Sequence, residues 1–190
     1  VNADAMATTN TLTLTGAGAV TLSSTDANIN ASAYTGAVTA TVNNDGSVAT
    51  FQVGTVSSSI DAQGTNLLTV NALAMADGQL LTLTGTGAAS VTNLQANLVS
   101  STGGAVGVTV VDVPTLEATN NGAGLMTINA AAMTDTDLLT INGSGDITVT
   151  GLAADLTSTV AGAGSAVDIT TVDVATQTIA LGADALGTRT

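Results

Sequence analysis

Aspartate residues at recurring positions are the strongest candidates for chemistry in this sequence. Asp77 and Asp135 occupy matching positions of a repeated phrase (135 − 77 = 58), and Asp112 and Asp173 form a second matching pair. Asp137 follows Asp135 in the segment TDTD. Carboxylate and backbone carbonyl oxygens in turns are the ligands that calcium prefers. These five aspartates are therefore the predicted ligands of any bound calcium, and no other cofactor is indicated. The alternative is that they accept local hydrogen bonds in turns.

Few residues that could perform catalysis are present. The chain has no histidine, no cysteine and a single basic residue, so none of the usual nucleophile–base pairs can be assembled. Carboxylate pairs such as Asp135/Asp137 or Asp168/Asp173 could flank a glycosidic bond. Only two aromatic residues are present, however, and no aromatic platform for a sugar accompanies these pairs. The sequence predicts a protein without enzymatic activity.

Glycine pairs of the form Gly-x-Gly recur along the chain. None continues as G-x-G-x-x-G or G-x-x-x-x-G-K, so they do not indicate a phosphate-binding loop. Tight turns that need a positive φ angle explain them better. The pairs are Gly16/Gly18, Gly85/Gly87 and Gly143/Gly145.

Composition limits the class of protein and its partners. Fourteen acidic residues stand against one basic residue, which gives a net charge of −13 and disfavours binding to nucleic acid or to anionic membranes. The hydrophobic fraction of 45% with only 8% charged residues is typical of a folded chain. No apolar run approaches the roughly 18 residues that span a bilayer. We expect no membrane insertion.

One phrase occurs three times, as VNADAMATTNTLTLTGAG, VNALAMADGQLLTLTGTG and INAAAMTDTDLLTINGSG. Its methionines Met6, Met75 and Met133 are separated by unequal offsets (75 − 6 = 69 and 133 − 75 = 58). Repetition at such periods is typical of stacked architectures. The prediction is one elongated repeat domain over residues 1–190. Its internal repeats cover about 1–69, 70–127 and 128–190.

Apolar residues within each repeat alternate with threonine or another small residue, which predicts short strands about every nine residues. At most one helical turn is expected, in the Ala-rich segments NALAMAD and NAAAMTD. The alternation predicts that threonines 13, 82 and 140 face outward and that a set of apolar side chains shares one interior. That set is Leu12, Leu14, Leu81, Leu83, Leu139 and Ile141.

Two all-β architectures suit these strands. A repeat β-solenoid or β-roll-like stack has a narrow interior that Val, Ile, Leu and Ala can fill coil upon coil. Small antiparallel β-sandwich repeats are the alternative, because Asp45-Gly46 and Asn121-Gly122 are hairpin signals. A sandwich core usually contains large aromatic residues, which are nearly absent here. The sequence therefore favours the solenoid.

The phrases LTLTGTGAASVTNLQANL, NGSGDITVTGLAADL and NASAYTGAVTATV resemble the Thr/Gly/Ala-rich repeats of large secreted bacterial surface proteins, including RTX-like adhesins and S-layer proteins. The likeness covers most of the chain. It implies an extracellular or cell-surface, non-enzymatic structural region, often associated with calcium. The RTX calcium nonapeptide G-G-x-G-x-D-x-U-x is not met, and the nearest approach is the segment from Gly143 to Ile147.

The function expected from these features is that of a structural building block in a bacterial surface layer, adhesin stalk or filament. The expected partners are copies of the same chain, joined end to end or laterally. Val1 starts directly on the repeat phrase and TQTIALGADALG at residues 176–187 looks like the start of another unit, so unpaired strand edges are expected. Alternatively, the chain is one segment of a longer array. A calcium-stabilised or ice-binding adhesion module is the alternative function, since outward rows of threonine can order water.

Overall fold

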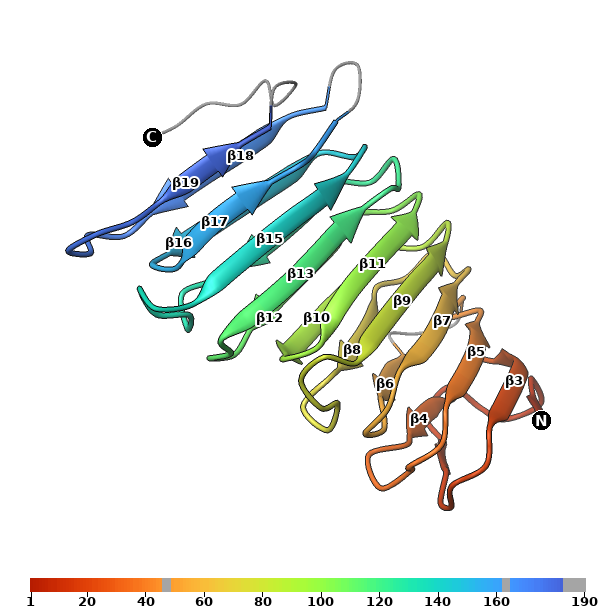
Figure 1. Ribbon diagram of the computed structural model, residues 1–190. Coiled ribbons are helices and arrows are strands. Elements are labelled where there is room, and N and C mark those ends of the chain that lie inside the picture. Colours follow the sequence, from red (N-terminus) through yellow and green to blue (C-terminus); the bar gives the residue numbers. More distant parts are fainter. Residues whose placement is uncertain (46–48, 162–164, 183–190) are drawn as a thin grey trace.

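The protein is an all-β solenoid made of two parallel sheets that the chain visits alternately (Figure 1). The computed structural model describes residues 1–45, 49–161 and 165–182, and these contain no helix. The odd sheet has ten strands: β1 (Asn2–Ala3), β3 (Val20–Thr25), β5 (Val38–Val42), β7 (Ser58–Ala62), β9 (Leu80–Gly85), β11 (Asn97–Thr102), β13 (Thr115–Asn120), β15 (Leu138–Gly143), β17 (Asp155–Ser158) and β19 (Ile179–Leu181). The even sheet has nine: β2 (Thr11–Thr13), β4 (Asn28–Asn30), β6 (Thr50–Gln52), β8 (Leu68–Asn71), β10 (Ala89–Leu94), β12 (Val106–Val110), β14 (Met126–Asn129), β16 (Ile147–Leu152) and β18 (Val167–Thr171).

Each coil of the solenoid contains one strand of each sheet. In the odd sheet Val38 pairs with Ser58, Ser58 with Leu81 and Leu81 with Leu98, so the offsets between partners are 20 (58 − 38), 23 (81 − 58) and 17 (98 − 81). A strand spacing of about 4.8 Å sets the rise of each coil. The predicted solenoid is confirmed.

The antiparallel alternative is wrong, because every strand pair in the described residues is parallel. A hairpin returns the chain antiparallel to the strand before it. Asn121-Gly122, read as a hairpin signal, instead lies in the connection that carries the chain from β13 to β14 in the other sheet. For the second signal, Asp45-Gly46, Gly46 lies outside the described residues. So do residues 183–187 of the phrase that begins at Thr176.

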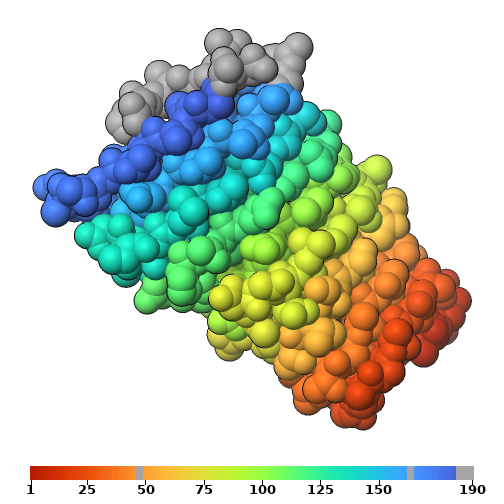
Figure 2. Space-filling model, viewed as in Figure 1, coloured from red at the N-terminus to blue at the C-terminus, as the bar shows by residue number. Residues whose placement is uncertain are grey.

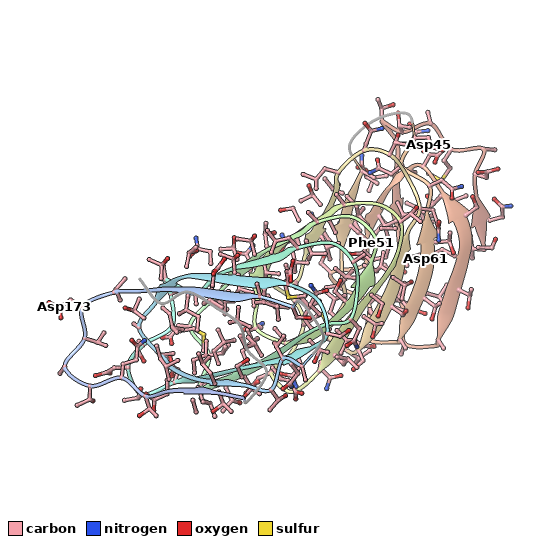
Figure 3. The ribbon with its side chains drawn as sticks, turned by 90° about the horizontal axis from the view of Figure 1, so that it is seen from above. Asp45, Phe51, Asp61 and Asp173 are labelled. Atoms are coloured by element: carbon pink, nitrogen blue, oxygen red, sulfur yellow. The ribbon has the colours of Figure 1, made fainter. Side chains whose placement is uncertain are left out.

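The core is a narrow apolar layer between the two sheets. Four of the six predicted interior residues, Leu81, Leu83, Leu139 and Ile141, are fully buried, and Leu12 and Leu14 pack partly buried against the same cluster. Phe51, in β6, lies between the layers (Figure 3). Of the threonines expected to face outward, Thr13 is exposed and the other two, at 82 and 140, are half-buried on the outer surface.

The repeated methionine phrase forms a tight turn and not a helical turn. In every copy the methionine N–H donates to the alanine carbonyl three residues earlier, at 3.0 Å, in the pairs Met6–Ala3, Met75–Ala72 and Met133–Ala130. Met75 and Met133 are buried. The phrase therefore turns the chain from one sheet to the other and closes the end of the apolar layer with a flexible side chain.

The first copy of the phrase lies in the opposite sheet from the other two. Leu12 is in β2 of the even sheet, whereas Leu81 and Leu139 are in β9 and β15 of the odd sheet. The offset between the last two copies (139 − 81 = 58) advances the chain by six strands, an even number, and the offset between the first two (81 − 12 = 69) advances it by seven. The smallest repeating unit of the fold is therefore one strand with its turn. The same sequence phrase can form a strand in either sheet.

The first glycine of each Gly-x-Gly pair has the positive φ angle expected of a tight turn. The φ angles of Gly16, Gly85 and Gly143 are 118°, 103° and 110°. At Gly143 a Cβ atom would lie only 2.1 Å from the carbonyl oxygen of Asn120 in the coil before it. Gly85 and Gly143 therefore allow close stacking of coils at the corner. The turn interpretation is confirmed for the first glycine of each pair.

Candidate functional site

The five aspartates predicted to bind calcium lie along one edge of the solenoid. All are in connections that lead from the even sheet to the odd sheet, and parallel strands place every such connection on the same side. Asp77 follows β8, Asp112 follows β12, Asp135 and Asp137 follow β14, and Asp173 follows β18. Asp173 extends from the outer end of its connection in Figure 3. The fold therefore brings residues that are distant in sequence to one edge.

Along that edge the aspartates are spread out. Only the connections that carry Asp112 and Asp135 belong to adjacent coils, and the intervening connections at 95–96 and 153–154 contain no acidic residue. Within the described ranges no three His, Cys, Asp or Glu side chains are grouped closely enough to hold a metal ion. Calcium at this edge would depend on backbone carbonyls for most of its ligands, and the site stays a prediction.

Asp137 has a local structural role. It is 7% exposed, and its Oδ2 accepts hydrogen bonds from the backbone N–H of Thr134 at 2.6 Å and from the Thr134 hydroxyl at 3.0 Å. Asp135 is exposed in the same turn. A carboxylate engaged in this way stabilises the turn. Neither member of this pair, the first considered for glycoside hydrolysis, lines the pocket beside β4, β6 and β8 that is described below. The second pair is split, with Asp168 in β18 and Asp173 beyond the end of that strand.

Calcium binding can be tested by thermal unfolding. A ligand that binds only the folded state at 100 times its Kd adds about 2.7 kcal/mol of stability, which would raise the Tm of a chain this long by roughly 5–10 °C. Because Asp137 is engaged, and because no three acidic side chains of the described residues are grouped closely enough to hold a metal ion, we expect equal Tm values in excess EDTA and in millimolar calcium. A rise of several degrees in calcium, abolished in the D112N/D135N double variant, would contradict this expectation.

The outer face of the even sheet, which we call the even face, carries two rows of small, mostly neutral polar residues. The first row is continuous, and the second is interrupted by a shift of register between β10 and β12. One row contains Thr11, Asn28, Thr50, Thr69, Ser90, Gly107, Thr127, Thr148 and Asp168. The other contains Thr13, Asn30, Gln52, Asn71, Thr92, Thr109, Asn129 and Thr150. Threonine occupies more than half of these positions, and none is an aliphatic or basic residue. Asp168 is their only charged member.

Several members of the even face are hydrogen-bonded to the coil beside them. The Thr50 hydroxyl donates to Asn28 Oδ1 at 2.9 Å. The hydroxyls of Thr92 and Thr150, at equivalent repeat positions (150 − 92 = 58), donate in the same way to backbone carbonyls of the preceding coil, each at 3.4 Å. The asparagines of the second row close turns, since the Oδ1 atoms of Asn71 and Asn129 each accept an N–H from two residues further on. These bonds hold the side chains in place.

The outer face of the odd sheet differs chemically from the even face. It carries the carboxylates of Asp61 and Glu117, which accept hydrogen bonds from Thr84 at 3.1 Å and Asn142 at 2.6 Å. Exposed leucines also lie at the starts of its strands. Figure 2 shows this face, with the coils as successive ridges across it. The two sheets therefore share an interior and present different surfaces.

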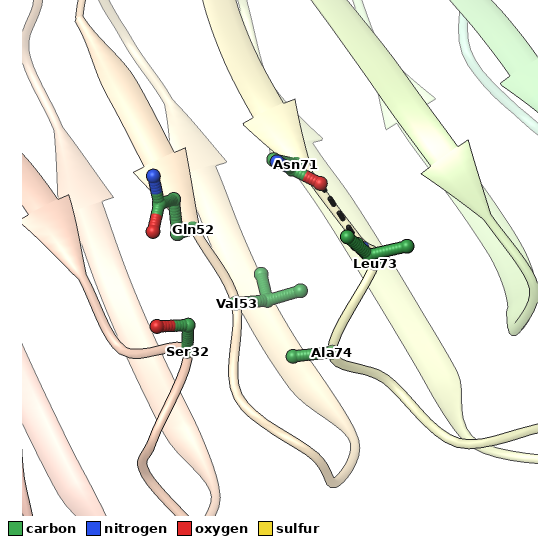
Figure 4. Close-up of a pocket in the computed structure, with 6 residues that line it drawn as sticks. All are labelled: Ser32, Gln52, Val53, Asn71, Leu73 and Ala74. Atoms are coloured by element: carbon green, nitrogen blue, oxygen red, sulfur yellow. Dashed lines mark hydrogen bonds between the residues drawn. The ribbon is translucent and has the colours of Figure 1, made fainter.

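A surface pocket of about 260 Å³ lies where β4, β6 and β8 leave the even sheet (Figure 4). Leu73, which is 60% exposed, forms part of its wall. The pocket contains no titratable side chain, so it offers no group for acid–base catalysis. Its lining consists of Ser32, Gln52, Val53, Asn71, Leu73 and Ala74.

Two buried asparagines were not anticipated as key residues. Asn120 Nδ2 donates to the carbonyls of Gly124 at 2.9 Å and Asp146 at 2.8 Å, and its Oδ1 accepts the N–H of Gly122 at 3.1 Å. Asn44 exchanges side-chain-to-backbone hydrogen bonds with Asn66 in the next coil. Both lie in Asn-Asn doublets, which was the available signal in the sequence. They join successive coils at the corner opposite the calcium candidates.

No protein-family model, curated protein or solved structure matches this chain significantly. The described residues also contain no helix that is long and apolar enough to cross a membrane.

Proposed function

We propose that this chain is a non-enzymatic structural protein, an extracellular β-solenoid building block of a bacterial surface layer, adhesin stalk or filament. The observation that carries the proposal is the continuity of both sheets: strand after strand pairs with the coil before and the coil after it. Neighbouring coils therefore share hydrogen bonds and an apolar layer along the whole described stack. Such a stack transmits load along its axis and holds its surfaces at fixed intervals.

The chemical inventory supports a structural role. No member of the two carboxylate pairs considered for catalysis, Asp135/Asp137 and Asp168/Asp173, lines the pocket beside β4, β6 and β8. A second shallow pocket of about 210 Å³, on the odd sheet near β5, β7 and β9, is lined only by Ala, Val, Leu, Ser and Thr. The extracellular setting rests on the resemblance of the Thr/Gly/Ala-rich phrases to bacterial surface repeats.

Recurring exposed leucines support lateral association with copies of the chain. Leu80 and Leu138 start β9 and β15 and are 38% and 37% exposed. Leu67 and Leu125, just before β8 and β14, are 44% and 43% exposed. Members of each pair lie three coils apart, which is about 14 Å along the axis at about 4.8 Å per coil. The interior does not require these leucines, and regularly spaced apolar points on both edges suit contacts with neighbouring solenoids.

Assembly can be tested with the purified full chain. We expect light scattering to show concentration-dependent oligomers and electron microscopy to show regular fibres or sheets. In the Leu80→Asp/Leu138→Asp variant association should weaken at least tenfold, because two apolar contacts become charged. A control variant, Thr82→Asp/Thr140→Asp, adds the same charge on the same two strands and should still associate. A wild-type chain that stays monomeric at high concentration would refute the assembly proposal.

A further inference from the structure

We propose that the even face binds ice through its two rows of small polar side chains. Ice binding at this face does not require self-assembly. The register of the even sheet places Thr69 beside Ser90, Thr127 beside Gly107, and Thr148 beside Thr127. Positions within a row are about 4.8 Å apart, and the two rows are about 6.6 Å apart, the rise of two residues in a strand. The first row crosses all nine strands of the even sheet, and the second lies beside it on eight of them, with one shift of register between β10 and β12. We call the two rows together the grid.

The grid has the chemistry that an ice surface requires. Ice is neutral, and each of its surface oxygens donates and accepts hydrogen bonds at regular intervals of a few ångströms. Threonine and serine hydroxyls can do both, and amide side chains add donors and acceptors. Although the chain contains 14 acidic residues, Asp168, at the β18 end, is the only one in the two rows. Charged side chains orient the surrounding water in hydration shells that do not match ice. Because such side chains are scarce on this face, it is better suited to contact ice.

The side chains of the grid are also held in place before any ligand binds. Thr92 and Thr150 donate to carbonyls of the adjacent coil in the same geometry, and Thr50 donates to Asn28. Side chains that are already ordered lose little entropy when they contact a surface. The odd face lacks this combination, because carboxylates and leucines interrupt its polar rows.

Thermal hysteresis and inhibition of ice recrystallisation in dilute solutions of the full chain test the proposal. We expect the wild-type protein to show both and to shape growing ice crystals. The Thr127→Lys/Thr148→Lys variant places two charges on neighbouring strands of the grid and should lose most of both activities. The matched control is Thr140→Lys/Thr157→Lys, at a paired and similarly half-buried position on β15 and β17 of the odd face. This control should retain wild-type activity.

These measurements distinguish ice binding by the even face from self-association through the same face. Thermal unfolding of both variants establishes that they are folded. The proposal is overturned if the wild-type chain shows no hysteresis and no inhibition of recrystallisation, or if the two lysine variants lose activity equally. It is also overturned if ice activity is absent and light scattering shows that only Thr127→Lys/Thr148→Lys abolishes self-association, since the even face would then be a contact between copies. Light scattering of the same samples measures assembly through the leucines separately. The ice-binding proposal and the assembly proposal can therefore fail independently.

Discussion

Replacing Leu139 with alanine is expected to lower the free energy of unfolding by about 2–5 kcal/mol. Leu139 is fully buried in β15, where it pairs in register with Leu116 of the preceding coil and Leu156 of the next. The substitution removes apolar contacts to two coils at once and leaves a cavity that the hydrogen-bonded strands on both sides cannot readily close. Chemical denaturation followed by circular dichroism measures the change as a shift of the midpoint.

The neighbouring leucine provides the control for this substitution. Leu138 precedes Leu139 in the same strand but points outward and is 37% exposed. Leu138→Ala should therefore change the stability by no more than about 0.5 kcal/mol. Equal destabilisation by the two substitutions would show that the strand does not direct alternate residues to the interior and the surface as described.

The second large effect is expected for Gly143→Ala, which should destabilise the fold by about 2 kcal/mol or more. Two causes act together. The φ angle of 110° is in a region where a residue with a side chain is strained by about 1–3 kcal/mol. The added Cβ would also lie 2.1 Å from the carbonyl oxygen of Asn120, so one backbone must move and weaken the corner that Asn120 organises. Thermal or chemical unfolding of the variant measures the loss.

Gly107→Ala is the matched control for Gly143→Ala. Gly107 lies in β12 on the even face, its φ angle is not positive, and a Cβ there would meet nothing within 4 Å. Alanine restricts the unfolded chain more than glycine does, so this substitution should be neutral or stabilise by up to about 1 kcal/mol. A loss at Gly107 as large as that at Gly143 would argue against the backbone explanation.

Short-range patterns predicted the local structure well. The alternation around Leu81, Leu83, Leu139 and Ile141 predicted which side chains are buried, because the side-chain period of a strand is set by its own backbone. The recurrence of glycine at the ends of these strands predicted the positive φ angles. How the strands pair was harder to predict from the sequence. Asn121-Gly122 can form the turn of an antiparallel hairpin, or it can lead the chain into a second sheet. The choice depends on partners in the neighbouring coils, which are distant in the sequence.

The candidate sites depend even more on distant residues. Their recurring positions in the repeat identified the five aspartates. The sequence could not indicate that Asp137 accepts hydrogen bonds from Thr134, whereas Asp77 is exposed on a separate coil. Threonine rows appear interrupted along the chain, for example in GVTVVDV and VTNLQ. In the folded protein, neighbours within a row come from successive coils, so an odd-sheet strand always separates them in the sequence. The even face was therefore not apparent before the register was known.

By itself, the sequence determined that this chain forms short strands with an apolar side, that its turns need glycine, and that one phrase recurs at two unequal offsets. Only the tertiary structure decided that these offsets correspond to seven and six strands, which places Leu12 in the even sheet and Leu81 in the odd sheet. The physical reason is that both sheets face the same narrow apolar layer. A strand with the right alternation can complete either of them. Whether the number of strands between two copies is odd or even determines whether they join different sheets or the same sheet.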